Sequence, residues 1–309
     1  MLPRACRSTV RLRIALSLFT LPALAFGQPD KQPFDGQLAM EHIAQQVSFG
    51  PRTADYAGKQ KTLTYIQQLL EPEADQVLVQ SFKSYGLVGN NLWASFYGTD
   101  SKQTNHRRIM LAAHWDTRPI AEHDSVPAKR AEPVIGANDG ASGVAVLLEI
   151  ARLLSEKRAP ATIDLVFFDL EDMGNIDNLP FSIGATEFVR KNPFYRPNAG
   201  VVVDMVCDRE LEIPLERFSR DGAKDLQDQI WRIARSQGAT AFKDRKGTYI
   251  EDDHLPFLRA GLDVVNLIHW PFPKSWHTSG DTIDQCSADS LQQVGRVIAE
   301  FIYLKREPL

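Results

Sequence analysis

From residue 107 onward, the chain alternates short runs of large apolar residues with longer segments of helical periodicity. Four of these runs, at 108–114, 163–168, 201–206 and 264–269, are mostly apolar along their length rather than at every second position. Such runs are typical of strands that are buried on both faces of a sheet. Because helical segments separate them, the pattern predicts a mostly parallel sheet with helices packed against both faces.

The segments before residue 107 add two helices and two strands to this pattern. Apolar residues recur with helical spacing over 35–50 and 55–70. Strand-like residues over 75–82 and 90–98 enclose a turn that contains glycine. Further helices are expected over 139–157, 182–191, 221–238, 251–261 and 287–306. The predicted fold is a single-domain α/β/α sandwich of the α/β class, with a mixed, mostly parallel central sheet flanked by helices on both faces.

The N-terminus has the three-part layout of a secretory signal peptide. The segment MLPRACRSTVRLR contains four arginines and no acidic residue, and the apolar run that follows ends with small residues at Ala25 and Gly27. Pro22 interrupts this run, which is too short for a comfortable membrane span. We therefore expect a signal peptide at 1–27, a catalytic domain at 28–309, export to the periplasm or the medium, and no stable membrane span after cleavage.

The charge balance argues against nucleic acid as a partner. The chain has 35 Lys and Arg against 39 Asp and Glu, so loss of the four N-terminal arginines would leave a net charge of about −8. The sequence contains no basic stripe interleaved with aromatic residues. It leaves the oligomeric state open, with a monomer favoured.

Two cysteines, Cys207 and Cys286, lie outside the predicted signal peptide. In an exported protein they could form a disulfide, but sequence alone does not place them within bonding distance. Cys207 lies in an apolar, strand-like run, where a buried free thiol is the simpler interpretation. Both alternatives stay open at this point.

Histidine and carboxylate residues follow the predicted strands. They occur in the segments HWD, GANDGASG, DLED, VVVD and WHTSGD, each at a strand end or in the loop that comes after it. In an open α/β sheet, ligands bind beyond the carboxyl ends of the strands, so these side chains are expected to meet at one edge. The residues concerned are His114, Asp116, Asp139, Asp169, Glu171, Asp172, Asp204 and His277.

A divalent metal ion explains this concentration of negative charge. Glu171 and Asp172 are adjacent, and closely spaced carboxylates repel one another and are costly to bury. A bound cation lets them ionise together. Two histidines among carboxylates suit zinc better than calcium or magnesium, which prefer oxygen ligands. Taken singly, HWD could be a solvated strand end and WHTSGD a polar turn, but their shared place at strand ends favours a metal site.

The order of these motifs resembles a known superfamily. HWD, NDGASG, FFDLED, VVD and WHT occur in the order of the zinc aminopeptidase superfamily, which carries two co-catalytic metal ions. The segments EDDHLPFLRAGLDVVNLI and WPFPKSWHTSGDT resemble its glutaminyl cyclase branch, the glutaminyl-peptide cyclotransferases of the animal-like type. The resemblance runs from about residue 40 to the C-terminus. It implies an enzyme that converts the N-terminal Gln of peptides and proteins to pyroglutamate and releases ammonia.

The resemblance also implies a metal site with a single zinc ion. Asp139, Asp172 and His277 would be its ligands, although many relatives have Glu at the position of Asp172. This shorter side chain would shift the metal or require a different loop path. Glu171, next to Asp172, would act as the general acid and base.

Further roles follow from the same resemblance. Asp204 and Asp252 would form a hydrogen-bonded carboxylate pair or relay near the general base. Trp276 would form a wall of the pocket for the glutamine side chain, with Phe272 packed beside it. Cyclases of this type often have a tryptophan in the loop after the acidic pair, but the corresponding loop here, MGNIDNLPFS, contains none.

Two other functions stay open. A two-zinc aminopeptidase would hydrolyse N-terminal residues, with Glu171 activating a water molecule. Its metal ligands would be His114, Asp139, Asp172, Asp204 and His277. Asp252 favours the cyclase, because a hydrogen bond to Asp204 would withdraw that carboxylate from a second metal. A catalytically inactive binding ectodomain is the third alternative, but it would typically lack the general base or a ligand, and all of these residues are present.

Overall fold

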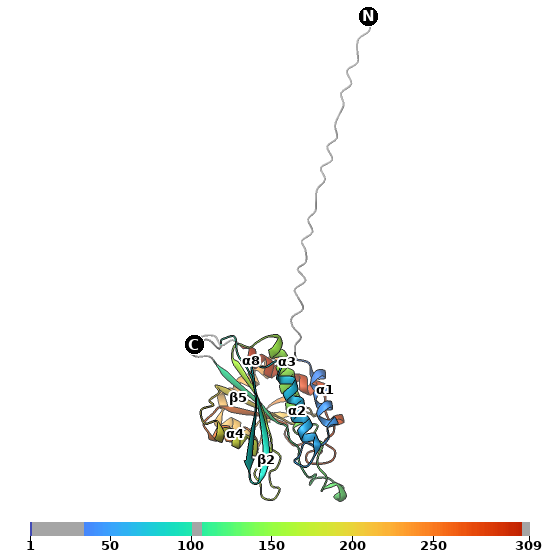
Figure 1. The fold of residues 1–309 in the computed structure, drawn as a ribbon. Coiled ribbons are helices and arrows are strands. Elements are labelled where there is room, and N and C mark those ends of the chain that lie inside the picture. The colour runs from blue at the N-terminus through green and yellow to red at the C-terminus, as the bar shows by residue number, and fades with distance from the viewer. Residues whose placement is uncertain (2–33, 101–106, 305–309) are drawn as a thin grey trace. The chain divides into compact units, whose positions relative to one another are not determined.

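The computed structural model describes residues 34–100 and 107–304, together with Met1. Apart from Met1, the predicted signal peptide lies outside the described residues. In the described part, the chain forms a central sheet with helices on both faces (Figure 1). No helix in that part is both long and apolar enough to cross a membrane.

The central sheet has six strands in the order β1-β2-β4-β3-β5-β8. Strand β2 pairs antiparallel with β1 and β4, whereas β4, β3, β5 and β8 form a parallel block. The predicted mixed, mostly parallel sheet is therefore confirmed. The strands are β1 (Gln76–Ser84), β2 (Leu87–Phe96), β3 (Arg108–His114), β4 (Thr162–Phe168), β5 (Ala199–Asp204) and β8 (Val264–Ile268).

Helices cover the two faces of the sheet unequally. The larger layer, which includes α1, α2 and α3 on one side of the sheet in Figure 1, consists of α1 (Gly36–Ser48), α2 (Ala57–Leu70), α3 (Ala141–Glu156), α6 (Lys224–Ser236) and α8 (Ala288–Tyr303). The opposite face carries α4 (Ile183–Lys191) and α7 (Leu255–Arg259), with the short α5 (Arg217–Gly222) beside α7. This arrangement is the predicted α/β/α sandwich.

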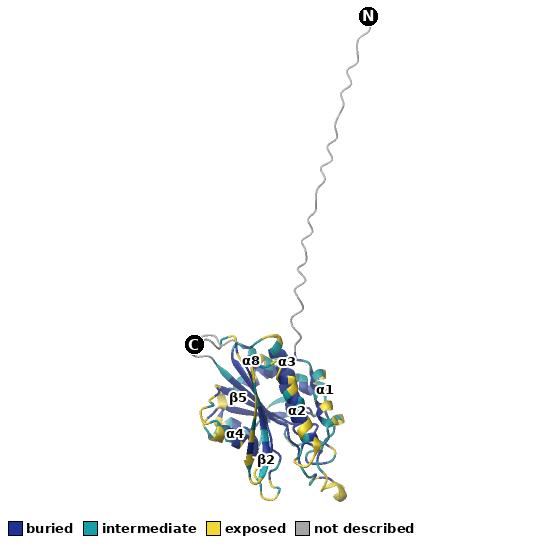
Figure 2. Ribbon diagram, viewed as in Figure 1, coloured by how far each residue is buried: buried dark blue, intermediate teal, exposed yellow. Residues whose placement is uncertain are grey.

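Alternate residues of β3 pack into different cores. Ile109, Leu111 and Ala113 belong to the core under the larger helical layer. Met110 and Ala112 belong to the smaller core with α4 and α7. All five are fully buried, and the central strands are dark in Figure 2. Because successive strand side chains point to opposite faces, a strand covered on both faces needs the continuous apolar run that the sequence shows.

Two details differ from the sequence-based prediction. The single helix expected over 221–238 is replaced by α5 and α6, which are separated at Ala223, where the backbone leaves the helical conformation. The helical segment begins earlier than expected because the Glu216 carboxylate accepts hydrogen bonds from the amides of Phe218 and Ser219 and caps α5. Asp252 was expected inside a short helix, but α7 begins only at Leu255. A small parallel pair, β6 (Ile213–Leu215) with β7 (Phe242–Lys246), was not predicted, because a three-residue strand is too short to show periodicity.

Cys207 and Cys286 are joined by a disulfide bond with an S–S distance of 2.02 Å. Cys207 follows β5, and Cys286 lies just before α8, so the bond ties these two elements together. The sequence left this pairing open, and the simpler interpretation of Cys207 as a free thiol is wrong. The two residues are 79 positions apart, and only the fold brings them together.

Candidate active site

The carboxyl ends of the parallel strands meet at one edge of the sheet and deliver the predicted side chains there. Strand β3 ends at His114, and β5 ends at Asp204. The loops after β3, β4 and β8 supply the others, which are Asp139, Glu171, Asp172 and His277. Asp169 is the exception, since its carboxylate lies 2.9 Å from Nζ of Lys59 and accepts a hydrogen bond from the amide of Asn90.

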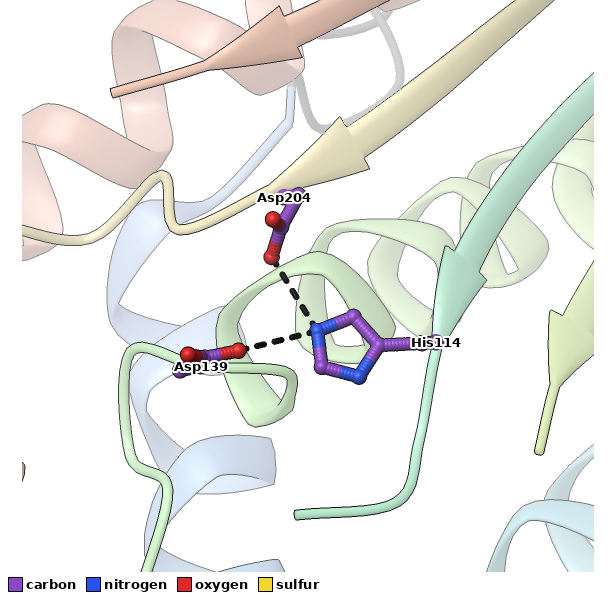
Figure 3. A group of neighbouring side chains, drawn as sticks. All are labelled: His114, Asp139 and Asp204. Carbon is purple, nitrogen blue, oxygen red and sulfur yellow. Dashed lines mark hydrogen bonds and ion pairs between the residues drawn. The ribbon is translucent and has the colours of Figure 1, made fainter. Parts of the chain in front are cut away.

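His114, Asp139 and Asp204 form the first group of potential metal ligands. Nε2 of His114 lies 3.0 Å from Asp139 Oδ1 and 3.1 Å from Asp204 Oδ1, as the dashed lines in Figure 3 indicate. Burial would lower the pKa of His114, but the carboxylates of Asp116, Asp139 and Asp204 raise it well above its usual value. In this arrangement, His114 holds the two carboxylates together directly.

Asp139, Asp172 and His277 form the second group, and each of them offers a ligand atom within 4.8 Å of the other two. Nε2 of His277 lies 3.1 Å from Asp172 Oδ1 and 3.8 Å from Asp139 Oδ2. Burial raises the pKa of Asp172, and the nearby charge of Asp139 raises it further. Asp139 belongs to both groups, so the two sites would share one bridging carboxylate.

The second group suits a zinc ion. Oδ2 of Asp172 is buried and has no hydrogen-bond partner among the described residues, and a buried polar atom of this kind calls for a partner. Two carboxylates and one imidazole are a donor set that zinc binds, with a fourth position left open in catalytic sites. The shorter side chain of Asp172 therefore still places an oxygen 3.1 Å from Nε2 of His277.

Two further carboxylates hold the loops that carry these ligands. Asp281 accepts hydrogen bonds from the amides of Asn138 and Asp139, at 2.8 and 3.0 Å. Asp116 accepts from the amides of Glu171 and Asp172, both at 3.1 Å. Burial and the charge of Asp139 raise the pKa of Asp281 to about 7. Asp116 was among the residues named from the sequence, but without this role, and Asp281 was not singled out, although the two belong to the quoted HWD and WHTSGD segments.

Arg118 and Glu122 hold His277 in place, a role that was not predicted from the sequence. The Glu122 carboxylate lies 3.0 Å from Nδ1 of His277. Nε of Arg118 donates to Glu122 at 3.0 Å, and its Nη1 donates to the carbonyl oxygens of Asp172 and Gly174 at 3.0 and 2.8 Å. The only sequence signal was an Arg–Glu pair four residues apart in the loop after HWD, which does not reveal a contact with His277.

Glu171 lies buried beside the second group, with 6% of its surface exposed. Burial raises its pKa well above the usual value; His114 opposes this, whereas the charges of Asp252 and Asp253 add to it. Its Oε1 lies 3.4 Å from the Ser182 hydroxyl. A carboxyl group with a raised pKa can both accept and return a proton near neutral pH.

The predicted hydrogen-bonded pair of Asp204 and Asp252 takes a different form. Asp252 accepts hydrogen bonds from the side-chain amide of Asn266, at 2.6 Å, and from the backbone amide of Asp253. Asp204 instead contacts His114. Burial and the charge of Asp252 together raise the pKa of Asp204 to about 7. The two carboxylates are thus electrostatically coupled, although each has other hydrogen-bond partners.

These groups open into a cavity of about 350 Å³. Trp276 and Phe272 line it, with ring centroids 4.3 Å apart, and Trp276 stacks on His277 at 3.9 Å. The loop after the acidic pair, which has no tryptophan, contributes Asn175 and Phe181 to the lining. The cavity therefore combines metal-binding groups on one side with aromatic walls that would fit a short side chain.

Three residues at this edge have left-handed backbone conformations that are uncommon for side-chain-bearing residues. They are Leu170, directly before Glu171, Met205, directly after Asp204, and His277 itself, with φ of 59°, 48° and 53°. Such conformations cost roughly 1–3 kcal/mol each and cluster at functional sites. The backbone is thus held in sparsely populated conformations next to Glu171 and Asp204 and at His277.

The sequence profile of peptidase family M28 matches residues 91–302. The chain belongs to this family. A Bos taurus relative named glutaminyl-peptide cyclotransferase-like protein is 28% identical over 233 residues, which are 63% of this chain and 56% of the relative. This chain thus matches little more than half the length of that relative.

Two solved structures are similar to this chain over about nine-tenths of its length. The glutaminyl cyclase of Bacteroides thetaiotaomicron bound to N-acetylhistamine is 32% identical with a TM-score of 0.82, over 89% of this chain and 99% of that one. A leucine aminopeptidase precursor from B. thetaiotaomicron gives the same identity and TM-score, over 90% and 99%. The predicted resemblance to the zinc aminopeptidase superfamily and its glutaminyl cyclase branch is confirmed.

Proposed function

We propose that this chain is a zinc-dependent glutaminyl cyclase, which converts the N-terminal Gln of peptides and proteins to pyroglutamate and releases ammonia. The observation that carries this proposal is the position of Glu171. It is buried, its pKa is raised, and it lines the same cavity as the zinc-compatible group of Asp139, Asp172 and His277. Relatives named as glutaminyl cyclases support the substrate class.

One zinc ion per chain would be held by Asp139, Asp172 and His277. When bound, it would polarise the side-chain carbonyl of the substrate's Gln as a Lewis acid. Glu122 would orient His277 for this purpose through the contact with Nδ1. The coordinating Nε2 would then face the cavity.

Glu171 would move the proton that the reaction requires. The free α-amine of Gln attacks its own side-chain amide carbon, so that a C–N bond forms within the substrate. Glu171 takes a proton from the amine and delivers it to the amide nitrogen, which leaves as ammonia. Its raised pKa suits both halves of this transfer. No water molecule is consumed.

Asp204 and Asp252 would assist Glu171 as a coupled pair. Both line the cavity, and the charge of Asp252 raises the pKa of Glu171 and of Asp204. A proton carried by one carboxyl of this electrostatically coupled pair would stabilise the nitrogen of the tetrahedral intermediate. Asn266 fixes Asp252 in place through its hydrogen bond.

Trp276 and Phe272 would hold the Gln side chain in a curled conformation. Cyclisation requires the amine and the amide carbon to meet, and such positioning can supply a large part of the rate enhancement. Rigid aromatic walls suit this task because they have few rotatable bonds. The tilted packing of the two rings provides such a wall.

A two-zinc aminopeptidase is the second candidate, and a specific observation favours it. His114 and Asp204 lie near Asp139, which would bridge two metal ions. A solved relative named as an aminopeptidase precursor is as similar as the cyclase. In the cyclase that we propose, His114 and Asp204 contact each other directly and Asp204 serves proton transfer. An inactive binding ectodomain is disfavoured because Glu171 and all candidate ligands are present at the site.

The remaining features belong to the same proposal. A signal peptide at 1–27 would direct the catalytic domain at 28–309 to the periplasm or the medium. The partners would be peptide or protein N-termini that bear Gln, without nucleic acid. A monomer is the favoured oligomeric state, which the sequence leaves open.

Ammonia release tests the proposal. Purified protein with zinc is incubated with Gln-Phe-Ala and with the same peptide acetylated at its N-terminus. We expect ammonia from the free peptide only, because acetylation blocks the attacking amine, and at least a roughly 100-fold loss in Glu171→Gln. Absence of ammonia from Gln-Phe-Ala with zinc-loaded protein would overturn the proposal.

A further inference from the structure

A second hollow adjoins the active-site cavity. It has a volume of about 320 Å³ and lies between the β1–β2 turn, the start of α4 and helix α7. Phe181, Glu251 and Asp252 line both hollows, so the two lie side by side at these residues. The second hollow also includes Ser182 and Arg259, which do not line the first. The proposed function, on which this inference depends, gives it no role.

The position of Glu171 indicates where a peptide substrate continues. The amide end of the Gln side chain belongs at the metal ligands, and the α-amine belongs at Glu171. Because the α-carbon carries both the amine and the rest of the peptide, the chain must leave the site on the Glu171 side. Glu171 lies 3.4 Å from Ser182, which lines the second hollow. The residues after Gln are therefore directed into that hollow.

Two charged groups along this path have no partner of their own. Glu251 and Arg259 are exposed, and neither has an ion pair or side-chain hydrogen bond within the part of the chain that the structure describes. The other two carboxylates of the second hollow have partners: Glu187 is bound to Arg190 at 2.7 Å, and Asp252 accepts hydrogen bonds from Asn266 and from the amide of Asp253. Glu251 lines both hollows, whereas Arg259 lines only the second one. A peptide that leaves the active site would thus pass the unpaired carboxylate of Glu251 first and the unpaired guanidinium of Arg259 second.

We propose that the second hollow binds the residues that follow the N-terminal Gln, and that Arg259 binds a carboxylate located beyond the second residue. This carboxylate is either an acidic side chain or the free C-terminus of a short peptide. Arg259 can hold it with paired hydrogen bonds. Glu251 repels an acidic residue at the second position, so the preference depends on position as well as charge.

Four peptides separate these possibilities. Gln-Ala-Ala-Ala-amide has no charge after Gln and serves as the reference. Gln-Glu-Ala-Ala-amide has an acidic side chain at the second residue, and Gln-Ala-Glu-Ala-amide has one at the third. Gln-Ala-Ala has a free C-terminal carboxylate and no acidic side chain. For the wild-type protein, we expect kcat/KM to be about two- to fivefold higher for an acid at the third residue than for the neutral peptide. An acid at the second residue gives no gain. A gain with Gln-Ala-Ala as well would add the C-terminus as a source of the carboxylate.

Arg259→Gln tests the assignment, with Arg232→Gln on α6 as the matched control for loss of one exposed positive charge. We expect Arg259→Gln to abolish the difference in kcat/KM between the acidic and the neutral peptide, while Arg232→Gln keeps that difference. A wild-type protein without the preference, or a preference that survives in Arg259→Gln or disappears in Arg232→Gln, would overturn the inference. Failure to turn over even the neutral peptide would contradict the proposed function instead.

Discussion

The Glu122 carboxylate lies 3.0 Å from Nδ1 of His277, while Nε2 of the same ring lies 3.1 Å from Asp172. Arg118 holds Glu122 from the other side. Burial would raise the pKa of Glu122, but His277 and Arg118 lower it to about 2. Glu122 is therefore ionised at neutral pH and keeps Nδ1 protonated, which leaves Nε2 as the metal-binding atom.

Glu122→Ala should weaken zinc binding about 10- to 100-fold, because the supporting partners of a metal-bound histidine fix its tautomer and orientation. Competition with a chelator of known zinc affinity measures this directly and does not depend on activity. Glu132→Ala is the matched control, since Glu132 is an exposed carboxylate of the same loop. Unchanged zinc affinity in Glu122→Ala would show that Glu122 does not support the ligand.

Asp252→Asn should shift the acidic limb of the kcat–pH profile to lower pH. Glu171 must be deprotonated to accept the amine proton, so activity falls as the pH drops through its pKa. Burial and the charges of Asp252, Asp253 and Asp172 raise that pKa, and His114 opposes them. Removal of one negative charge therefore lowers it. The wild-type limb should lie well above the ordinary carboxyl value of about 4.3. A limb that stays in place or moves upward would contradict this coupling.

Trp276→Ala should reduce kcat/KM for Gln peptides by roughly 10- to 100-fold, because it removes an aromatic wall worth about 1.5–3 kcal/mol of apolar contact. Trp276→Phe should retain most of the activity, since it keeps a flat ring between Phe272 and His277. Steady-state kinetics with one Gln peptide compares the three proteins. Equal activity of the Ala and Phe variants would exclude Trp276 as a substrate wall.

Replacement of both Cys207 and Cys286 by alanine should lower the free energy of unfolding by about 2–4 kcal/mol, because the bond closes a loop with a sequence separation of 79. Chemical denaturation of the oxidised protein and of the double variant measures the difference. Zinc content should stay the same, because neither cysteine is among the candidate ligands. An unchanged denaturation midpoint would mean that the bond does not contribute to stability.

The sheet was predictable because its central strands are covered on both faces. Strand β3 must be apolar at successive positions, since Ile109 and Met110 pack into different cores. The short β6 and the division between α5 and α6 were not predictable. Glu216 caps α5, but the sequence does not distinguish it from neighbouring polar residues that could also cap a helix, because the outcome depends on tertiary contacts. Boundaries of this kind depend on contacts that a local pattern does not contain.

The candidate metal ligands could be named from the sequence because each stands at the carboxyl end of a strand or in the loop that follows it. The carboxylates that support these ligands through hydrogen bonds could not be predicted from the sequence. Glu122 contacts His277 across 155 positions of sequence, and Asp281 reaches the amide of Asp139 across 142. A carboxylate in a loop looks the same in the sequence whether it is solvated or buried against a ligand. The disulfide partner of Cys207 was hidden for the same reason.

The most direct test of the central claim is a mixture of Gln-Phe-Ala and Leu-Phe-Ala incubated with the zinc-loaded protein and followed by mass spectrometry. Intramolecular cyclisation predicts that the first peptide loses one ammonia while the second stays intact. Release of free leucine from Leu-Phe-Ala, with no loss of ammonia from Gln-Phe-Ala, would contradict the cyclase and place His114 and Asp204 at a second metal ion of an aminopeptidase.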